Sequence, residues 1–259
     1  MPYWITPHSP LAAINITIRR ILLAALLLGP PALANANPTH SIKPYKAIYS
    51  SKVKGVAAEV EQTLNKTDNQ QWQLRSYASM LLTSIEKKAT FVIKGNQLIP
   101  LGYHSSNGLI SQRNSELVFD TENQTVLDQL HGKEALPLIE NTFDHLSFQS
   151  QLRLDLLNDA HFKQKTYHLI DRSKLKTYQV KKLGEETITT PLGTFTAVKL
   201  EQRRPNKNKY ILIWLAKDWD YFLLRIVRIK EGKEEYQIDL KTAELDGQMI
   251  KSIEGIKTE

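Results

Sequence analysis

The sequence predicts a mainly β protein, in which a strongly curved antiparallel sheet or barrel of about a dozen strands packs against one helix at about residues 142–157. Three patterns support this fold class. Apolar and polar residues alternate with a period of two from Tyr45 onward, turn-forming residues recur about every ten residues, and a single segment has helical spacing instead. Short strands at this spacing are typical of an antiparallel meander or barrel.

The strands of the first half are predicted from their alternating faces. Every second residue of the segments 45–53 and 72–82 falls on one face, which carries Tyr45, Ala47, Tyr49, Ser51 and Val53 in the first segment and Trp72, Leu74, Ser76, Ala78, Met80 and Leu82 in the second. Turn signals containing Asn, Asp or Gly separate the runs at residues 66–70, 94–97, 106–108 and 120–124.

One segment, Asn141 to Asp159, is predicted to form the helix. It lacks Gly and Pro, and its large apolar residues fall at roughly helical spacing, at Phe143, Leu146, Leu154 and Leu157. Asn141 or Thr142 would cap its first turn. Counted from Asn141, Asp144 is the third helical residue, where a carboxylate can reach back to the cap amide.

The alternation resumes at about Lys163 and continues to about Glu244. Its clearest turn is TPLG at residues 190–193, where Pro191 suits the second position of a type I turn and Gly193 the fourth. The next strand should therefore begin near Phe195.

Asp218 and Asp220, within YILIWLAKDWDYFLLRIVRI at residues 210–229, allow two interpretations. They could form a carboxylate pair in a cleft, as acid/base chemistry requires, or they could occupy a hairpin turn between two apolar strands. We favour the turn, because Asp side chains bond nearby backbone amides. The strand 210–216 is apolar on both faces, so we expect the helix to cover one face and a filled or ligand-holding lumen to lie at the other.

The N-terminal segment is typical of a secretory signal peptide. Arg19 and Arg20 precede an apolar run, Ile21–Leu28, and small residues follow, which predicts cleavage near residues 34–37. The run is shorter than the ~20 residues that cross a bilayer, and the Gly29-Pro30-Pro31 break disfavours the alternative, a signal anchor. We therefore predict a signal peptide at 1–36, a single β-rich envelope domain at 37–246 and a frayed tail at 247–259. The mature protein would be periplasmic, without a transmembrane span.

The composition narrows the function classes. The chain has no cysteine, which excludes disulfides, thiolate metal sites and a lipidated cysteine. The net charge of +7 is modest and its signs are interleaved, so no nucleic-acid partner is predicted. The densest basic stretch, Arg203–Lys209, fits a solvated hairpin loop better than a contact with lipid head groups.

No motif of a known catalytic or metal site is present. His161 and His168 are seven residues apart, whereas a metal site needs three or four converging ligands. Asp144 and His145 are neighbours on the predicted helix and point in different directions, so they do not form a relay. We therefore predict no catalytic residue, metal or cofactor, although a triad assembled in space would leave no fixed spacing, which keeps an enzyme open.

Three stretches of the chain resemble a family of exported bacterial proteins, the domain of unknown function 3108. They are FDHLSFQSQLRLDL at 143–156, the segment at 167–204 that contains TPLGTF, and IWLAKDWDYFLLRIVRIKEG at 213–232. The resemblance extends over about Tyr45 to Leu245. It implies a β-rich envelope protein of Gram-negative bacteria and no assigned activity or catalytic residue.

The leading functional hypothesis is a periplasmic binding or carrier protein for a lipid, an acyl chain or another amphipathic envelope component. An architecture of this kind resembles the periplasmic lipoprotein carriers at the level of the fold alone. The candidate ligand-binding residues are aromatic: Tyr49, Trp72, Tyr77, Tyr103 and Trp214. Core packing is the alternative role for each of them. Two other functions stay open, a non-enzymatic assembly or scaffold protein that offers a sheet edge to an envelope partner, and an envelope hydrolase acting on glycan or peptide.

Overall fold

Sixteen strands form one sheet in the part of the chain that the computed structural model describes, residues 40–253 without 54–55, 81–82, 109, 133 and 172. The first nine are β1 (Tyr45–Val53), β2 (Val56–Lys66), β3 (Trp72–Met80), β4 (Thr83–Lys94), β5 (Gln97–Asn107), β6 (Ser115–Asp120), β7 (Thr125–Asp128), β8 (Leu136–Pro137) and β9 (Thr142–Phe143). After the helix α2 (His145–Asn158) follow β10 (Gln164–Ile170), β11 (Leu175–Thr190), β12 (Gly193–Arg203), β13 (Lys209–Ala216), β14 (Phe222–Lys230), β15 (Lys233–Leu245) and β16 (Gln248–Met249). The 3-10 turns η1 (Ser111–Arg113) and η2 (Lys217–Trp219) complete the elements.

The sheet follows chain order in each half. Each strand from β1 to β8 pairs antiparallel with the next, as does each strand from β10 to β15, and the pairing of β1 with β15 joins the halves. β9 pairs with β10 in parallel. The predicted curved antiparallel sheet is therefore confirmed. The sheet has more strands than the dozen predicted. Three of them, β8, β9 and β16, are only two residues long, which is too short to show an alternating pattern.

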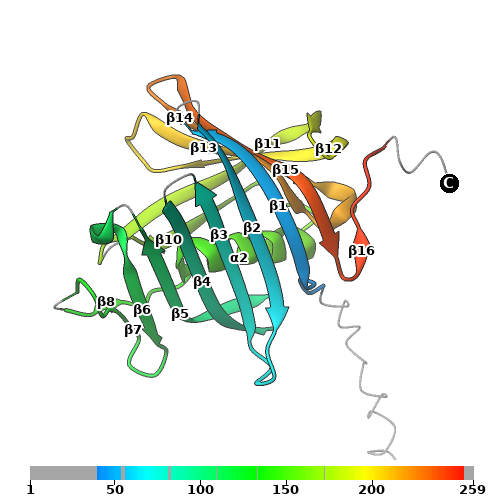
Figure 1. Ribbon diagram of the computed structural model, residues 1–259. Coiled ribbons are helices and arrows are strands. Elements are labelled where there is room, and N and C mark those ends of the chain that lie inside the picture. The colour runs from blue at the N-terminus through cyan, green and yellow to red at the C-terminus, as the bar shows by residue number, and fades with distance from the viewer. Residues whose placement is uncertain are drawn as a thin grey trace, which may run out of the picture. The chain divides into compact units, whose positions relative to one another are not determined.

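The helix lies within the curve of the sheet. Strands β1–β5 pass on one side of α2 and β10–β12 on the other (Figure 1). The inward face of β1 is the one that the alternation predicts, because Tyr45, Ala47, Tyr49 and Ser51 are all buried. The sheet remains open: its two end strands, β8 and β9, do not pair with each other in the part of the chain that the structure describes.

The start of α2 differs from the prediction. Asn141 has a positive φ of 57°, and Thr142 and Phe143 pair with His168 and Leu169 as strand β9. The chain therefore stays extended until Asp144, which is itself the N-cap, so neither Asn141 nor Thr142 caps the helix. Pairing with a distant strand outweighed the local capping preference.

The turn interpretation of KDWD is confirmed. Lys217–Trp219 form η2, and Asp220 follows it in the left-handed conformation with φ 52°, which Asp tolerates better than most residues. The Oδ2 atom of Asp220 lies 2.8 Å from Nζ of Lys43. The charge of Asp220 thus pairs with Lys43 at the turn.

The tail packs instead of fraying over its described part. Gln248 and Met249 pair with β15, Ile250 is buried, and the indole Nε1 of Trp219 donates a hydrogen bond to the carbonyl oxygen of Lys251 at 3.1 Å. No periodic pattern in the sequence indicates this packing, because the contacts are made to residues distant in the chain. Residues 254–259 of the predicted tail, like the predicted signal peptide at 1–36, lie outside the described residues.

Candidate functional site

A small cavity lies between α2 and the inner faces of β1, β13 and β14. Its volume is about 30 Å³, which is room for one or two water molecules. The wall is mostly apolar, with Tyr45, Tyr49, Phe148, Leu152, Ile213, Leu215, Phe222, Leu223 and Ile226, and its polar members are Gln62, Gln149, Ser150 and Arg153. An apolar wall with few polar groups is the usual composition of a ligand site.

Arg153 has the only charged side chain among the described residues that line this cavity. It lies on α2, is only 5% exposed, and its Nε and Nη2 atoms both donate to the carbonyl oxygen of Asp220 at 3.3 Å. The guanidinium carbon stands 5.6 Å from the ring centroid of Tyr45 and 5.2 Å from that of Phe222. Burial lowers the pKa of Arg153, while Tyr45, Tyr49 and Asp220 act to raise that pKa.

The neutral polar groups of the cavity form a short chain. The hydroxyl of Tyr45 donates to Oε1 of Gln62 at 3.2 Å, and Nε2 of Gln62 donates to Oε1 of Gln149 on α2 at 3.4 Å. Tyr49 donates to the carbonyl oxygen of Leu223 at 3.3 Å. Burial raises the pKa of Tyr45 to about 12 and also raises that of Tyr49, so both hydroxyls stay protonated at neutral pH and serve as hydrogen-bond donors.

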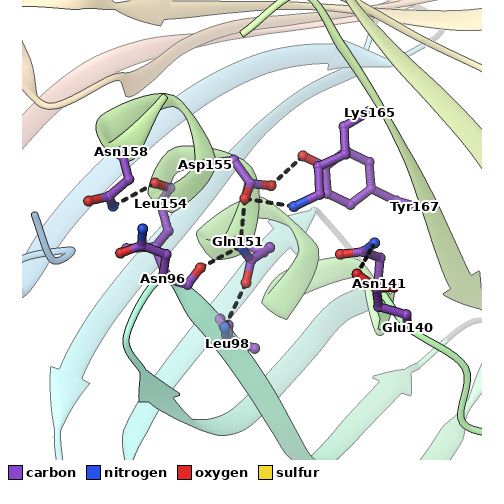
Figure 2. A network of polar contacts seen from close by, with 10 residues as sticks. All are labelled: Asn96, Leu98, Glu140, Asn141, Gln151, Leu154, Asp155, Asn158, Lys165 and Tyr167. Carbon is purple, nitrogen blue, oxygen red and sulfur yellow. Dashed lines mark hydrogen bonds and ion pairs between the residues drawn. The ribbon is translucent and has the colours of Figure 1, made fainter. Parts of the chain in front are cut away.

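On another side of α2, Gln151 fastens the helix to the edge of the first half of the sheet. β6 pairs with β5 only from Gly102 to Ser105, which leaves the start of β5 at an edge. The backbone N–H of Leu98 donates to Oε1 of Gln151 at 2.7 Å, and Nε2 of Gln151 donates to the carbonyl oxygen of Asn96 at 3.1 Å (Figure 2). A helix side chain thus supplies the hydrogen bonds that a neighbouring strand would make.

Asp155 extends this connection to the other half of the sheet. It accepts hydrogen bonds from Nε2 of Gln151 at 2.9 Å, from Nζ of Lys165 at 2.8 Å and from the hydroxyl of Tyr167 at 2.5 Å (Figure 2). Lys165 and Tyr167 belong to β10. The Gln151–Asp155 bridge therefore connects the two halves of the sheet, from the β4–β5 hairpin through α2 to β10.

The N-terminus of α2 carries a cluster of titratable groups. Asp144 is fully buried and accepts from the backbone N–H groups of Leu146 at 2.7 Å and Ser147 at 2.9 Å, and also from the hydroxyl of Ser147. Burial raises the pKa of Asp144 to about 6, although these hydrogen bonds act to lower it. Burial, followed by the charge of Lys87, lowers the pKa of His145 to about 4, so His145 is neutral at pH 7.

The structure brings one of the five predicted ligand-binding residues, Tyr49, to the cavity wall. Trp214 is buried, but Ile213 and Leu215 on either side of it line the cavity, so Trp214 lies on the opposite face of β13. Its indole Nε1 donates to Oε1 of Glu186 at 2.6 Å, and Nζ of Lys199 lies 5.0 Å from its ring centroid.

The other three lie elsewhere. Tyr103 is buried in the hydrophobic core. Trp72 is half-buried and packs against that core. Tyr77 follows the buried Ser76 on β3 and so lies on the other face of the strand. The guanidinium carbon of Arg75 lies 5.2 Å from its ring centroid. Ligand contact by these residues stays a prediction.

The sequence interpretation missed Arg153. One signal could have pointed to it. Arg153 is the only lysine or arginine between Asn141 and Asp159, and this single helix is predicted to pack against the sheet formed by the strands that precede and follow it. A lone cation on such a helix needs a partner, whether protein or ligand.

A curved β-sheet held around one internal helix places the protein among the β-barrel-like folds. The chain belongs to the family described as protein of unknown function (DUF3108), whose model matches residues 45–241. The resemblance noted in the sequence is thus confirmed. A search of curated proteins found no match.

Among the solved structures that are similar to the chain are two from bacteria. A β-barrel-like protein of domain of unknown function DUF1849 from Brucella abortus aligns with a TM-score of 0.55 at 10% identity, over 79% of this chain and 98% of that chain. The MucA/MucB complex of Pseudomonas aeruginosa aligns with a TM-score of 0.33 at 11% identity, over 78% of this chain and 52% of that chain. Of these two, the first alone is similar enough to bear on the fold, and it agrees with a barrel-like sheet. Within the described residues, no helix has the length and apolar character needed to cross a membrane.

Proposed function

We propose that the protein is a periplasmic binding or carrier protein for an amphipathic envelope component, such as a lipid or an acyl chain. The observation that carries this proposal is the cavity between α2 and the sheet, whose wall is apolar except for Arg153 and a few neutral polar groups. Such a wall suits a ligand with a long apolar part and a small polar part.

The volume of the cavity sets a condition on binding. Its 30 Å³ cannot hold an acyl chain, so α2 must move away from β1, β13 and β14 when a ligand enters. Several attachments of α2 suit such a movement because they are hydrogen bonds: Gln151 bonds to Leu98 and Asn96, and Arg153 to the carbonyl oxygen of Asp220. Hydrogen bonds of this kind contribute only about 0.5–1.5 kcal/mol each to stability, since water replaces them on opening.

Native mass spectrometry of the protein purified from the periplasmic fraction of its own host tests the proposal. We expect a bound mass in the range of a fatty acid or phospholipid, and we expect added dodecanoate to raise the midpoint of thermal unfolding, because a ligand of the folded state stabilises it. A protein that carries no bound mass and is not stabilised by any acyl compound would contradict the carrier function.

The structure gives less support to a scaffold that offers a sheet edge. The two end strands have two residues each, and β8 contains Pro137, which lacks the N–H group needed for pairing. Nor does the cavity favour a hydrolase, because its tyrosines stay protonated and its one charged group is an arginine.

The periplasmic location rests on the leader sequence. We propose that residues 1–36 form a cleaved signal peptide and that the envelope domain begins near residue 37, because Arg19 and Arg20, the apolar run Ile21–Leu28 and the small residues after it follow the pattern of such leaders. N-terminal sequencing of protein from the periplasmic fraction should give a start at Asn35 or Asn37. An intact chain that begins at Met1 and sediments with membranes would instead identify the apolar run as an anchor.

A further inference from the structure

We propose that the ligand carries an oxyanion head group, a carboxylate or a phosphate, and that Arg153 binds it. This inference rests on the proposed carrier function and names the class of its ligand.

Arg153 is a buried cation without a carboxylate partner. Within the described residues, no Asp or Glu oxygen lies within ion-pair distance of its guanidinium, and the carboxylate of the nearby Asp220 binds Lys43 instead. A cation shielded from water in this way is unfavourable unless an anion compensates it. An arginine retained at the wall of an apolar cavity is therefore explained if an anion arrives with the ligand.

The donors of Arg153 are only partly used. A guanidinium has five N–H donors, yet Nε and Nη2 share one acceptor, the carbonyl oxygen of Asp220, at the long distance of 3.3 Å each. No hydrogen-bond partner of Nη1 occurs in the part of the chain that the structure describes. A carboxylate or phosphate accepts two parallel N–H bonds from arginine and would make shorter, stronger contacts than this carbonyl.

The neighbouring polar groups suit an anion. The side-chain amides of Gln62 and Gln149 line the same cavity and keep N–H donors beyond the one that Gln62 gives to Gln149, while the single proton of the Tyr45 hydroxyl is already donated to Gln62. None of these groups brings a negative charge. Leu152, Phe222 and Ile226 add apolar wall to the same cavity, and the ring centroid of Phe222 lies 5.2 Å from the guanidinium carbon. The site therefore combines one cation, neutral donors and apolar surface, which matches the two ends of a charged amphiphile.

Three ligands of equal chain length test the head group: dodecanoate, dodecyl phosphate and dodecanol, titrated calorimetrically into protein purified from the periplasmic fraction of cells that express the full chain. We expect at least one of the two anions to bind roughly ten- to hundredfold more tightly than dodecanol, as charge-assisted hydrogen bonds imply. The anion that binds more tightly shows whether the head group is a carboxylate or a phosphate. Equal binding of all three would overturn the anion inference and leave the carrier function standing, whereas binding of none would overturn both.

Variants of Arg153 test the residue itself. Arg153→Met keeps much of the apolar length and should lose the preference for the anions while it retains dodecanol binding; Arg153→Lys should keep part of the preference. Arg203→Gln, which removes a more exposed arginine paired with Glu201 at 2.8 Å, is the matched control and should bind like the wild type. A folded Arg153→Met protein with unchanged preference would overturn the assignment. Should that variant fail to fold, the comparison of the three ligands on the wild type still decides the head group.

Discussion

Replacing Asp144 by alanine should lower the free energy of unfolding by about 2–4 kcal/mol. The Asp144 carboxylate is fully buried and is the acceptor for two backbone N–H groups and the hydroxyl of Ser147 at the start of α2. Alanine leaves these donors unsatisfied inside the sheet. Urea-induced unfolding measures the loss, and Asp68→Ala, at an exposed turn position after β2, is the control that should change stability much less.

The Asp144→Asn variant should separate the cap from the charge. Asparagine keeps an oxygen that can accept from the N–H groups of Leu146 and Ser147, so helix α2 should remain capped. It cannot ionise, and its effect on stability should therefore depend on pH. A raised pKa in the folded state gives stability that is present at low pH and is lost as pH rises from the ordinary value of 3.8 through about 6.

His145 has the opposite pH dependence. Its folded-state pKa is lowered from 6.5 to about 4 by burial and by Lys87 and Lys176, against the charge of Asp171, so its stabilising contribution is present above pH 6.5 and is lost as pH falls through about 4. Each shift corresponds to roughly 3 kcal/mol at most, and less for His145, which keeps some contact with solvent. The two contributions should largely cancel in the wild type.

The difference in the free energy of unfolding between a variant and the wild type, measured against pH, reveals each of the two contributions that cancel in the wild type. As pH increases from 4 to 6.5, we expect the free energy of unfolding of Asp144→Asn to rise relative to that of the wild type. The reason is that the contribution of the Asp144 carboxyl, which falls as pH increases, has been removed. His145→Asn should show the reverse slope, and the double variant should resemble the wild type in slope. An Asp144→Asn curve parallel to that of the wild type would show that the Asp144 carboxyl titrates normally.

The strands could be predicted from the sequence because their signal is local. The inward residues of β1 alternate along one short run, and the buried faces follow that alternation. For β13 the same reasoning could not choose a face, since both of its faces are apolar. Which face meets the cavity is decided by pairing with β12 and β14 and by the irregularity in register at Trp214 and Leu215, and this placed Ile213, not Trp214, at the cavity wall.

The candidate site depends on contacts between distant segments, which explains why the sequence did not reveal it. Arg153 meets the carbonyl of Asp220, 67 residues further along the chain, and Gln151 meets Leu98, 53 residues earlier. No spacing rule links such positions. The start of α2 was misjudged for a related reason, because a two-residue parallel pairing with β10 kept Thr142 and Phe143 extended.

Replacing Asp155 by alanine should loosen α2 and promote ligand binding. Asp155 is the one side chain of the Gln151–Asp155 bridge that contacts β10, through Lys165 and Tyr167, and Tyr167 is fully buried. Loss of the carboxylate leaves the Tyr167 hydroxyl without this acceptor, and we expect a loss of about 2–4 kcal/mol in the free energy of unfolding. Hydrogen exchange at the amides of α2 should become faster, because local opening now requires less energy.

The link to function comes from measuring dodecanoate binding on the same variant. If α2 must leave the cavity before a ligand enters, a helix held less tightly should bind dodecanoate roughly several-fold more tightly, since less binding energy is spent on opening. Tyr167→Phe, which removes one hydrogen bond, should show the same trend at about 1 kcal/mol. Asp159→Ala, at the exposed end of α2, is the matched control and should alter neither exchange within the helix nor binding. Faster exchange in α2 with unchanged dodecanoate affinity would show that the helix does not gate the cavity, and the requirement that α2 moves would then be wrong.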